Sequence, residues 1–167
     1  MKFTEFDLHP ALIAGIEKLG FTECTDIQNA AIPHILAGRD VAGLAQTGTG
    51  KTAAFLLPLM DRILKSDEIV SDEKTLNSDP QPSGEQGNIE SDSDMITAQG
   101  RGFSRYNKNN FILVLVPTRE LADQVCSNVR ELCPGGELKS AAVFGGTSYD
   151  RQIEQIKQGA DFIVATP

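Results

Sequence analysis

The first forty residues carry apolar side chains at helical spacing. A first apolar stripe, followed by a glycine, consists of Leu12, Ile13, Ile16, Leu19 and Gly20. This spacing predicts a helix that ends at the glycine. Thr25 followed by Gln28 is a capping-box pattern, which predicts the start of a second helix that reaches about Gly38. Pro33 lies inside this second stretch, and we expect it to bend or break the helix.

From residue 41 onward, short apolar runs alternate with stretches of helical spacing. The predicted strands are 41–45, 111–117, 140–144 and 161–167. The predicted helices are 52–64, 119–132 and 149–157. The run FILVLVP at 111–117 is unbroken, which is typical of a strand buried on both faces of a parallel sheet. Strands that alternate with helices indicate an α/β domain with a mostly parallel sheet.

Residues 66–108 differ in composition from the rest of the chain. Its central part, SDPQPSGEQGNIESDSD at 78–94, is rich in serine, aspartate, glycine, proline and glutamine, and nearly free of branched apolar residues. The whole stretch 66–108 holds nine acidic and four basic residues, and therefore most of the formal net charge of −8. Such a sequence buries too little apolar surface to offset the entropy of ordering it. We expect a disordered acidic insert on the surface of the domain.

Length and charge limit the classes of protein to be considered. The 167 residues predict one domain with its own core. The acidic balance argues against non-specific nucleic-acid binding through a basic surface, but leaves room for RNA contacts made by local groups. No apolar run approaches the roughly 20 residues that span a bilayer, and the N-terminus lacks the apolar core of a secretory signal. Cys24, Cys126 and Cys133 show no metal-binding spacing and are typical of reduced thiols in a cytosolic protein.

The strongest chemical motif lies between the predicted strand at 41–45 and the predicted helix at 52–64. It reads AQTGTGKT and consists of Ala45, Gln46, Thr47, Gly48, Thr49, Gly50, Lys51 and Thr52. The string fits the phosphate-binding loop, with alanine instead of glycine at its first position. Glycines let successive backbone N–H groups point into one concavity, and the helix N-terminus adds partial positive charge. We expect ATP to bind here, with Lys51 on the β- and γ-phosphates and the Thr52 hydroxyl on Mg²⁺.

A second motif lies upstream of the loop. The sequence GFTECTDIQ at 20–28, with Phe3 seventeen residues before it, resembles the Q motif of DEAD-box RNA helicases. The resemblance implies that Phe3, Phe21, Thr25 and Gln28 take part in nucleotide binding. A glutamine amide suits the N6–N7 edge of adenine, and the Phe3 ring would stack on the base. Two plainer roles remain open, because Gln28 can close the capping box with Thr25 and Phe3 can pack in the core.

Three further motifs follow in the order found in this family. PTRELA, GG and TP contribute Pro117, Thr118, Arg119, Gly145, Gly146, Thr166 and Pro167. Each motif lies where a predicted strand ends and passes into the next segment, so its backbone N–H groups face outward to meet phosphates, and Arg119 adds a charged partner. The resemblance implies that these residues bind the sugar-phosphate backbone of single-stranded or duplex RNA. Helix capping by Thr118 and a plain turn at the two glycines remain alternatives.

Apart from the insert, the resemblance covers the whole chain. It implies a P-loop RecA-like domain, with a Q-motif region at 1–40 and the N-terminal part of helicase domain 1 at 41–167. Finer matches, including FTEFDLHP from residue 3 and LAGRDVAG from residue 36, are similar to bacterial RhlB-type helicases. That similarity implies a cytoplasmic enzyme that hydrolyses ATP to remodel RNA duplexes and works with an RNA-degrading assembly.

The sequence contains neither the DEAD nor the SAT motif of that family, and no second RecA-like domain. Phosphoryl transfer depends on several charged groups acting together. Lys51 and Thr52 are expected to be catalytic in the full-length protein, but we expect the 167 residues alone to be inactive and their sheet to be incomplete. Two other hypotheses are a truncated, non-catalytic module that binds a nucleotide or a partner, and a P-loop ATPase unrelated to RNA.

Overall fold

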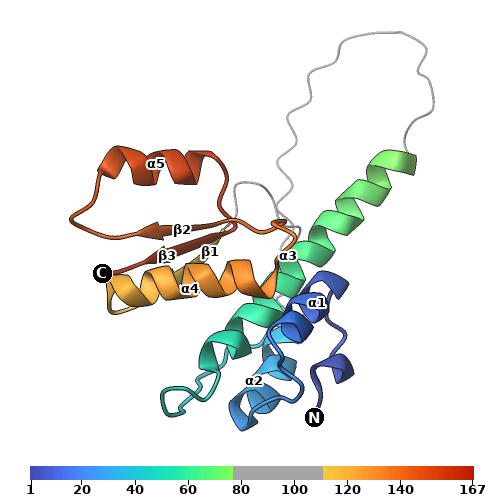
Figure 1. Cartoon of the computed structure of the whole chain (residues 1–167). Coiled ribbons are helices and arrows are strands. Elements are labelled where there is room, and N and C mark those ends of the chain that lie inside the picture. The colour runs from blue at the N-terminus through green and yellow to red at the C-terminus, as the bar shows by residue number, and fades with distance from the viewer. Residues whose placement is uncertain (77–110) are drawn as a thin grey trace, which may run out of the picture.

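The computed structural model of this protein describes the backbone of residues 1–76 and 111–167, and the side chains of residues 1–66 and 111–167. Its elements are the 3₁₀-helix η1 (Phe3–Glu5), α1 (Pro10–Lys18), α2 (Asp26–Leu36), α3 (Lys51–Leu76), β1 (Ile112–Leu115), α4 (Arg119–Leu132), β2 (Ser140–Val143), α5 (Tyr149–Lys157) and β3 (Phe162–Ala165). In Figure 1, α1 and α2 lie beside the first half of α3. The sheet, together with α4 and α5, lies to the left of α3 in this view. One hydrophobic core joins both parts, and the chain has the predicted α/β fold.

The first two helices begin and end where the sequence predicts. α1 ends at Lys18, and Gly20 has a φ of 73°, which glycine adopts at low cost. α2 begins after Thr25, whose backbone N–H donates to Gln28 Oε1 at 3.0 Å. Pro33 does not break the helix, because α2 runs through it to Leu36. A proline removes one N–H donor, and the bonds on either side continue the helix here.

α1 and α4 approach each other closely at a glycine. A Cβ atom at Gly15 would lie 2.1 Å from the carbonyl oxygen of Leu132, the last residue of α4. Gly15 is buried. The contact between the two helices therefore depends on the absence of a side chain at this position.

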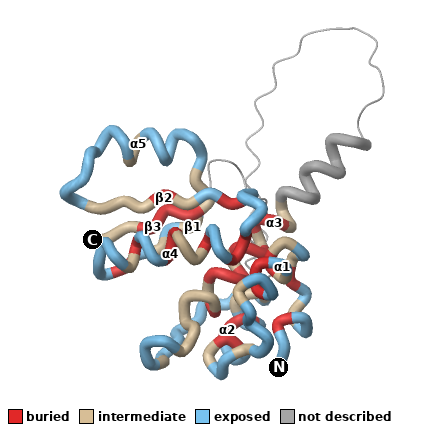
Figure 2. Tube along the Cα trace, viewed as in Figure 1, coloured by how far each residue is buried: buried red, intermediate tan, exposed pale blue. Residues whose placement is uncertain are grey.

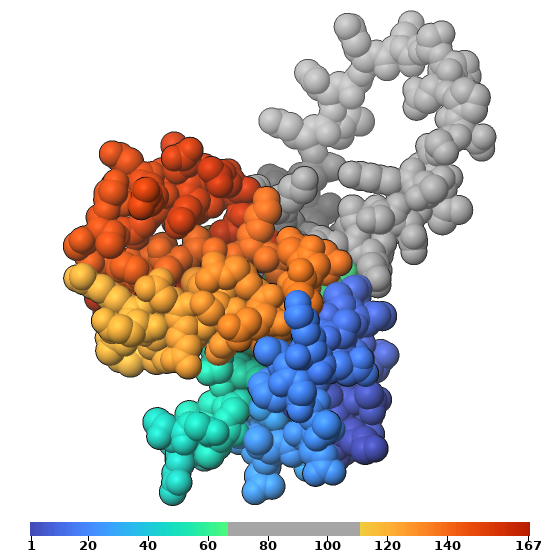
Figure 3. Space-filling model, viewed as in Figure 1, coloured from blue at the N-terminus to red at the C-terminus, as the bar shows by residue number. Residues whose placement is uncertain are grey.

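Residues 41–45 do not form the predicted strand. Leu44 is 99% exposed and Val41 is 41% exposed, and the segment has no regular secondary structure. A strand needs a hydrogen-bonded neighbour, and among the described residues the sheet consists of β1, β3 and β2 alone. The apolar sequence fits a buried strand, but in the described part of the chain the segment pairs with neither open edge of the sheet, at β1 or at β2. Figure 3 shows the segment before α3, in turquoise, projecting from the body of the molecule.

The described sheet has three parallel strands in the order β1–β3–β2. Val114 lies opposite Val164, which in turn lies opposite Ala142. Because all three strands are parallel, the loops that follow them leave from the same edge of the sheet. The sequence predicted four strands, whereas the described part of the chain contains three.

The two faces of the sheet are covered to different extents. α4 packs against the face that contributes Val114 and Val164 to the core. α5 packs against β2 on the other side, as Figure 1 shows, and Leu113 and Leu115 of β1 remain 54% and 65% exposed. The prediction that 111–117 is buried on both faces is therefore wrong. β1 is an edge strand, and α5 does not extend over it.

The first four turns of α3 form the centre of the core. Leu56, Leu57 and Met60 are completely buried, and the red segments of Figure 2 follow this helix and the sheet. Asp61, also buried, accepts the backbone N–H of His9 at 2.6 Å and lies 3.2 Å from the Lys65 ammonium. These partners satisfy the buried carboxylate. They also attach the segment before α1 to α3.

α3 continues to Leu76, beyond the predicted end at residue 64. Residues 66–76 are therefore helical, and the disorder predicted for them is wrong. Extending an existing helix is much easier than nucleating one, and most residues in this stretch tolerate the helical conformation. The rest of the predicted insert, at 77–108, lies outside the described residues. No helix in the described part is long and apolar enough to cross a membrane.

Candidate functional site

The segment before α3 has the backbone of a phosphate-binding loop. Gly48 and Gly50 have φ values of 81° and 86°, a conformation that strongly favours glycine. α3 begins directly after them at Lys51, so its free N–H groups and partial positive charge lie at the loop. The Thr49 hydroxyl donates to the Gln46 carbonyl oxygen at 2.8 Å and closes the turn. This geometry suits an anion such as a phosphate.

Lys51 and Thr52 are the first two residues of the helix and both are half-buried. The Lys51 ammonium donates to the carbonyl oxygens of Ala45 and Gln46 within the loop. Phosphate oxygens are stronger acceptors for an ammonium than neutral carbonyls. The Lys51 ammonium can therefore exchange its hydrogen bonds to these carbonyl oxygens for hydrogen bonds to a bound phosphate.

Gln28 connects α2 with the loop. Its side chain is buried, its Nε2 donates to the Gly50 carbonyl oxygen at 3.2 Å, and its Oε1 accepts from the Thr25 N–H. A Cβ atom at Gly50 would lie 2.4 Å from that Nε2, so the close approach also requires glycine. The bond from Thr25 confirms the plain capping role for Gln28. The bond to Gly50 is a second role that the sequence did not indicate.

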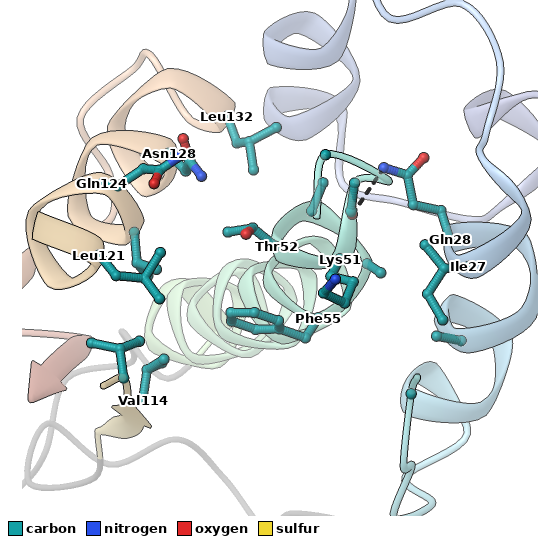
Figure 4. Close-up of a pocket in the computed structure, with 18 of the residues that line it drawn as sticks. Ile27, Gln28, Lys51, Thr52, Phe55, Val114, Leu121, Gln124, Asn128 and Leu132 are labelled. Carbon is teal, nitrogen blue, oxygen red and sulfur yellow. Dashed lines mark hydrogen bonds between the residues drawn. The ribbon is translucent and has the colours of Figure 1, made fainter. Parts of the chain in front are cut away.

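A pocket of about 790 Å³ opens beside the loop. In Figure 4, Ile27 and Gln28 of α2 lie on one side, Gln124 and Asn128 of α4 lie on the other, and Lys51 lies at the start of α3 between them. This volume is in the range of small-molecule sites. Polar groups are concentrated at the loop and on α4, and the rest of the lining is largely apolar.

The structure separates the two aromatic residues that were predicted to take part in nucleotide binding. Phe3 is 3% exposed and belongs to the hydrophobic core, whereas Phe21 is 46% exposed and lines the pocket. The plainer packing role of Phe3 is therefore confirmed, the ring does not line the pocket in this arrangement, and its stacking role stays a prediction.

The other predicted nucleotide-binding residues divide by position. Those that line the pocket are Phe21, Gln28, Thr47, Gly48, Gly50, Lys51 and Thr52. Those outside its lining are Thr25, Ala45, Gln46 and Thr49. Thr25, Ala45 and Gln46 supply backbone groups to Gln28 or Lys51, and Thr49 bonds within the loop, so these residues shape the site without facing it.

The predicted RNA-binding residues meet at one edge of the sheet. The Val116 N–H donates to the Ala165 carbonyl oxygen at 2.9 Å, and the Thr166 N–H donates to the Val143 carbonyl oxygen at 3.1 Å. The loops after the three strands are therefore neighbours, although they are far apart in the sequence. All of the predicted residues except the half-buried Thr166 are exposed: Pro117, Thr118, Arg119, Gly145, Gly146 and Pro167.

The start of α4 is also capped by its own residues. The Thr118 hydroxyl oxygen accepts the Leu121 N–H at 3.3 Å, which confirms the capping role left open for Thr118. A hydrogen bond from its own backbone N–H, and a second from Thr118, lower the pKa of the Glu120 carboxyl. Arg119 remains on the outside of this cap, with its guanidinium carbon 5.9 Å from the centre of the Phe144 ring.

Several polar residues of these regions were not predicted, among them Glu131, which lines the pocket. Gln124 and Asn128 line the pocket, and they stand four residues apart beside the apolar stripe of α4. Two side-chain amides at that spacing lie on one side of a helix, and this pattern could have indicated a polar binding surface there. Gln152 of α5 bonds to the loop after β2, and no spacing in the sequence pointed to it.

Burial raises the pKa of all three cysteine thiols. No group of three histidine, cysteine or acidic residues in the described part of the chain could hold a metal ion. The three cysteines are free thiols. Burial, followed by the hydrogen bond and charge of Glu137, raises the pKa of Cys133 to about 11, which disfavours the reactive thiolate.

Comparison with known proteins agrees with this geometry. The family model of the DEAD/DEAH box helicases matches residues 25–167. The chain is 41% identical over 165 residues to an ATP-dependent RNA helicase RhlB from Xanthomonas oryzae pv. oryzae. That match covers 99% of this chain and 23% of the relative, so the chain spans about a quarter of its length.

Two solved structures are also similar. A DEAD box protein from Methanococcus jannaschii is 29% identical with a TM-score of 0.69, over 100% of this chain and 35% of that one. The RNA helicase Prp28 from Chaetomium thermophilum, solved bound to ADP, is 33% identical with a TM-score of 0.62, over 96% of this chain and 30% of that one. The first similarity therefore includes the phosphate-binding loop and the sheet.

Proposed function

The chain belongs to the DEAD/DEAH box helicase family, and we propose that it supplies the nucleotide-binding part of an ATP-dependent RNA helicase. In the full-length protein, this activity would be RNA-stimulated ATP hydrolysis coupled to the remodelling of RNA duplexes. The relative from Xanthomonas oryzae pv. oryzae is named an ATP-dependent RNA helicase, and the match to it covers 99% of this chain. That match favours a helicase over a non-catalytic binding module or an ATPase unrelated to RNA.

The observation that carries the proposal is the backbone of the loop before α3. Two glycines with positive φ lead directly into a helix whose second residue is Thr52, and the pocket opens beside them. The unpaired N–H groups of the first helical turn can bind phosphate oxygens. Lys51 would transfer its hydrogen bonds from Ala45 and Gln46 to those oxygens.

The residues present also fit a magnesium ion bound together with ATP. Thr52 lies at the start of α3 and lines the pocket, so its hydroxyl is available near the phosphate site. Mg²⁺ is usually bound through few protein ligands together with phosphate oxygens, and bound with ATP it offsets phosphate charge. We assign Thr52 as the protein ligand of this ion in the described part of the chain.

For the base, we propose Phe21 as the stacking ring and Gln28 as the reader of the adenine edge. Phe21 is exposed toward the pocket that contains the loop. Gln28 Oε1 accepts one hydrogen bond, from Thr25, and Gln28 Nε2 donates one, to Gly50. Each of these two atoms can form one more hydrogen bond. Prp28, the solved relative bound to ADP, supports an adenine nucleotide as the ligand.

For RNA, we propose that the loops after β1, β2 and β3 contact the sugar-phosphate backbone. These loops share one edge of the sheet, and the exposed guanidinium of Arg119 lies among them. Phosphate contacts of this kind position RNA without reading its sequence. By the similarity to RhlB proteins, we further propose a cytoplasmic location and work alongside an RNA-degrading assembly.

The proposal is tested by replacing Lys51 in the full-length protein. Lys51→Ala should reduce RNA-stimulated phosphate release by about a hundredfold or more, because Lys51 is the basic residue of the loop sequence AQTGTGKT and would stabilise the negative charge of the transferred phosphoryl group. Lys18→Ala, at the exposed end of α1, is the matched control and should leave the rate unchanged. ATP hydrolysis at the unchanged rate in Lys51→Ala would refute the assignment.

A further inference from the structure

The side-chain amide of Gln152 holds the loop that follows β2. Its Nε2 donates to the Phe144 carbonyl oxygen at 3.0 Å, and its Oε1 accepts the Phe144 N–H at 3.0 Å. The same Nε2 donates to the Thr147 hydroxyl oxygen at 2.6 Å. One half-buried side chain from the first turn of α5 thus bonds to both backbone groups of the residue before the two glycines and to the residue after them.

The two residues held in this way enclose Gly145 and Gly146. Gly146 has a φ of 85°, and glycines have more backbone freedom than any other residue. A glycine pair left to itself would sample many conformations and would lose that freedom when a ligand binds. The bonds from Gln152 fix both ends of the pair before any ligand arrives.

Arg119 rests on the same loop. Its guanidinium carbon lies 5.9 Å from the centre of the Phe144 ring, a distance at which the cation is attracted to the ring face. A Cβ atom at Gly146 would lie 2.9 Å from both Arg119 Nη atoms, so the guanidinium packs directly over this glycine. The positions of Phe144 and Gly146 therefore determine where the Arg119 charge is presented.

We propose that Gln152 is a positioning residue for RNA binding, which acts through Phe144 and Gly146 to hold the Arg119 guanidinium toward the RNA backbone. This inference rests on the RNA-contacting surface proposed above. Gln152 need not touch RNA, since it acts by reducing the conformational freedom that Arg119 and the glycine pair would lose on binding. Its removal should weaken RNA binding and leave nucleotide binding intact, because the phosphate-binding loop is built from other elements.

The test uses four variants of the full-length protein: Gln152→Met, Arg119→Ala, the double variant, and the control Gln155→Met. Methionine keeps the length of the side chain and removes all three bonds. Gln155 lies on the same helix and is exposed. RNA affinity is measured by fluorescence anisotropy with a short labelled oligouridylate, nucleotide affinity with a fluorescent ATP analogue, and folding by thermal denaturation.

We expect Gln152→Met to weaken RNA binding by about three- to tenfold, with nucleotide affinity and the Gln155→Met control unchanged. The double variant should lose little more than Arg119→Ala alone, because both changes remove the same contact. A purely structural role for Gln152 predicts losses that add. Additive losses, or unchanged RNA affinity in Gln152→Met, would overturn the inference.

The two proposals fail in different ways. If Arg119→Ala leaves RNA affinity unchanged, the RNA-contacting surface itself is refuted, and the role of Gln152 with it. If Arg119→Ala weakens RNA binding and Gln152→Met does not, only the role of Gln152 is refuted. Should Gln152→Met fail to fold, Thr147→Val removes one of the three bonds at an exposed site, and an effect of about twofold that disappears in the Arg119→Ala background is expected.

Discussion

The side-chain amide of Gln28 lies 3.2 Å from the carbonyl oxygen of Gly50, and this hydrogen bond joins the start of α2 to the end of the phosphate-binding loop. The same amide accepts the N–H of Thr25. A residue predicted to read a base is thus also part of the structure that holds the loop. Any base bound by Gln28 would be linked directly to the backbone of Gly50.

Gln28→Ala should weaken ATP binding more than GTP binding in the full-length protein. Removal of the amide affects the loop for both nucleotides, but only adenine loses the edge contact proposed for it. Affinities for both nucleotides, measured by competition with a fluorescent analogue, give the comparison. Asn29→Ala, at the exposed neighbour on α2, is the control. Equal losses for ATP and GTP would leave Gln28 with its structural role alone.

Phe21→Ala should lower ATP affinity, whereas Phe3→Ala should lower the stability of the fold. Phe21 is exposed at the pocket, so its removal should lower ATP affinity by about tenfold, equivalent to roughly 1–2 kcal/mol of lost stacking, with little change in stability. Phe3 is buried, so its removal should lower the free energy of unfolding by about 3–5 kcal/mol. Denaturant unfolding and nucleotide titration of both variants separate the two roles. A loss of ATP affinity in a fully stable Phe3→Ala variant would contradict the assignment.

Asp61→Ala should destabilise the protein much more than Asp7→Ala does. Asp61 is 3% exposed and accepts the His9 N–H, so its removal breaks a buried hydrogen bond at a cost of about 1–3 kcal/mol. The Asp7 side chain contacts the same Lys65 but is fully exposed, and exposed ion pairs contribute little. The measurement is the free energy of unfolding in urea. Similar losses in the two variants would show that the buried bond is not the main attachment of the N-terminal segment.

The ionisation of Glu120 should make the stability of the domain depend on pH in the acid range. Its pKa is lowered in the folded protein by its own backbone N–H and by Thr118, so the charged carboxylate stabilises the fold. That contribution is complete above the unfolded pKa of about 4.3 and is lost as the pH falls through the lower folded value. The difference in unfolding free energy between wild type and Glu120→Gln should therefore shrink as the pH is lowered through this range. A constant difference would contradict the prediction.

Local patterns predicted the helices better than the strands. The bounds of α4 and α5 match the predicted 119–132 and 149–157, because caps and apolar spacing are encoded within each helix. The strand predicted at 41–45 is absent, because a strand requires a partner that its own sequence does not specify. The same limit explains β1, where an unbroken apolar run leaves Leu113 and Leu115 exposed.

The candidate site shows a similar division. Glycine spacing predicted the loop, because the positive φ at Gly48 and Gly50 is a local demand on residue type. The sequence left open whether Phe3 stacks on a base or packs in the core, since its burial depends on helices that arrive later in the chain. Gln152 was missed for the same reason, because its bonds to Phe144 exist only once α5 packs on β2.

The contact between Gly15 and the Leu132 carbonyl offers geneticists a way to lower the amount of this protein in a cell without altering its chemistry. A methyl group added by Gly15→Ala would have to force α1 away from the end of α4, while every proposed nucleotide- and RNA-contacting side chain would stay the same. Proteins destabilised in this way are removed by cellular proteases in proportion to their unfolded fraction. An allele at residue 15 would therefore act as a temperature-dependent control of dosage, against which alleles of Lys51 and Arg119 report on activity alone.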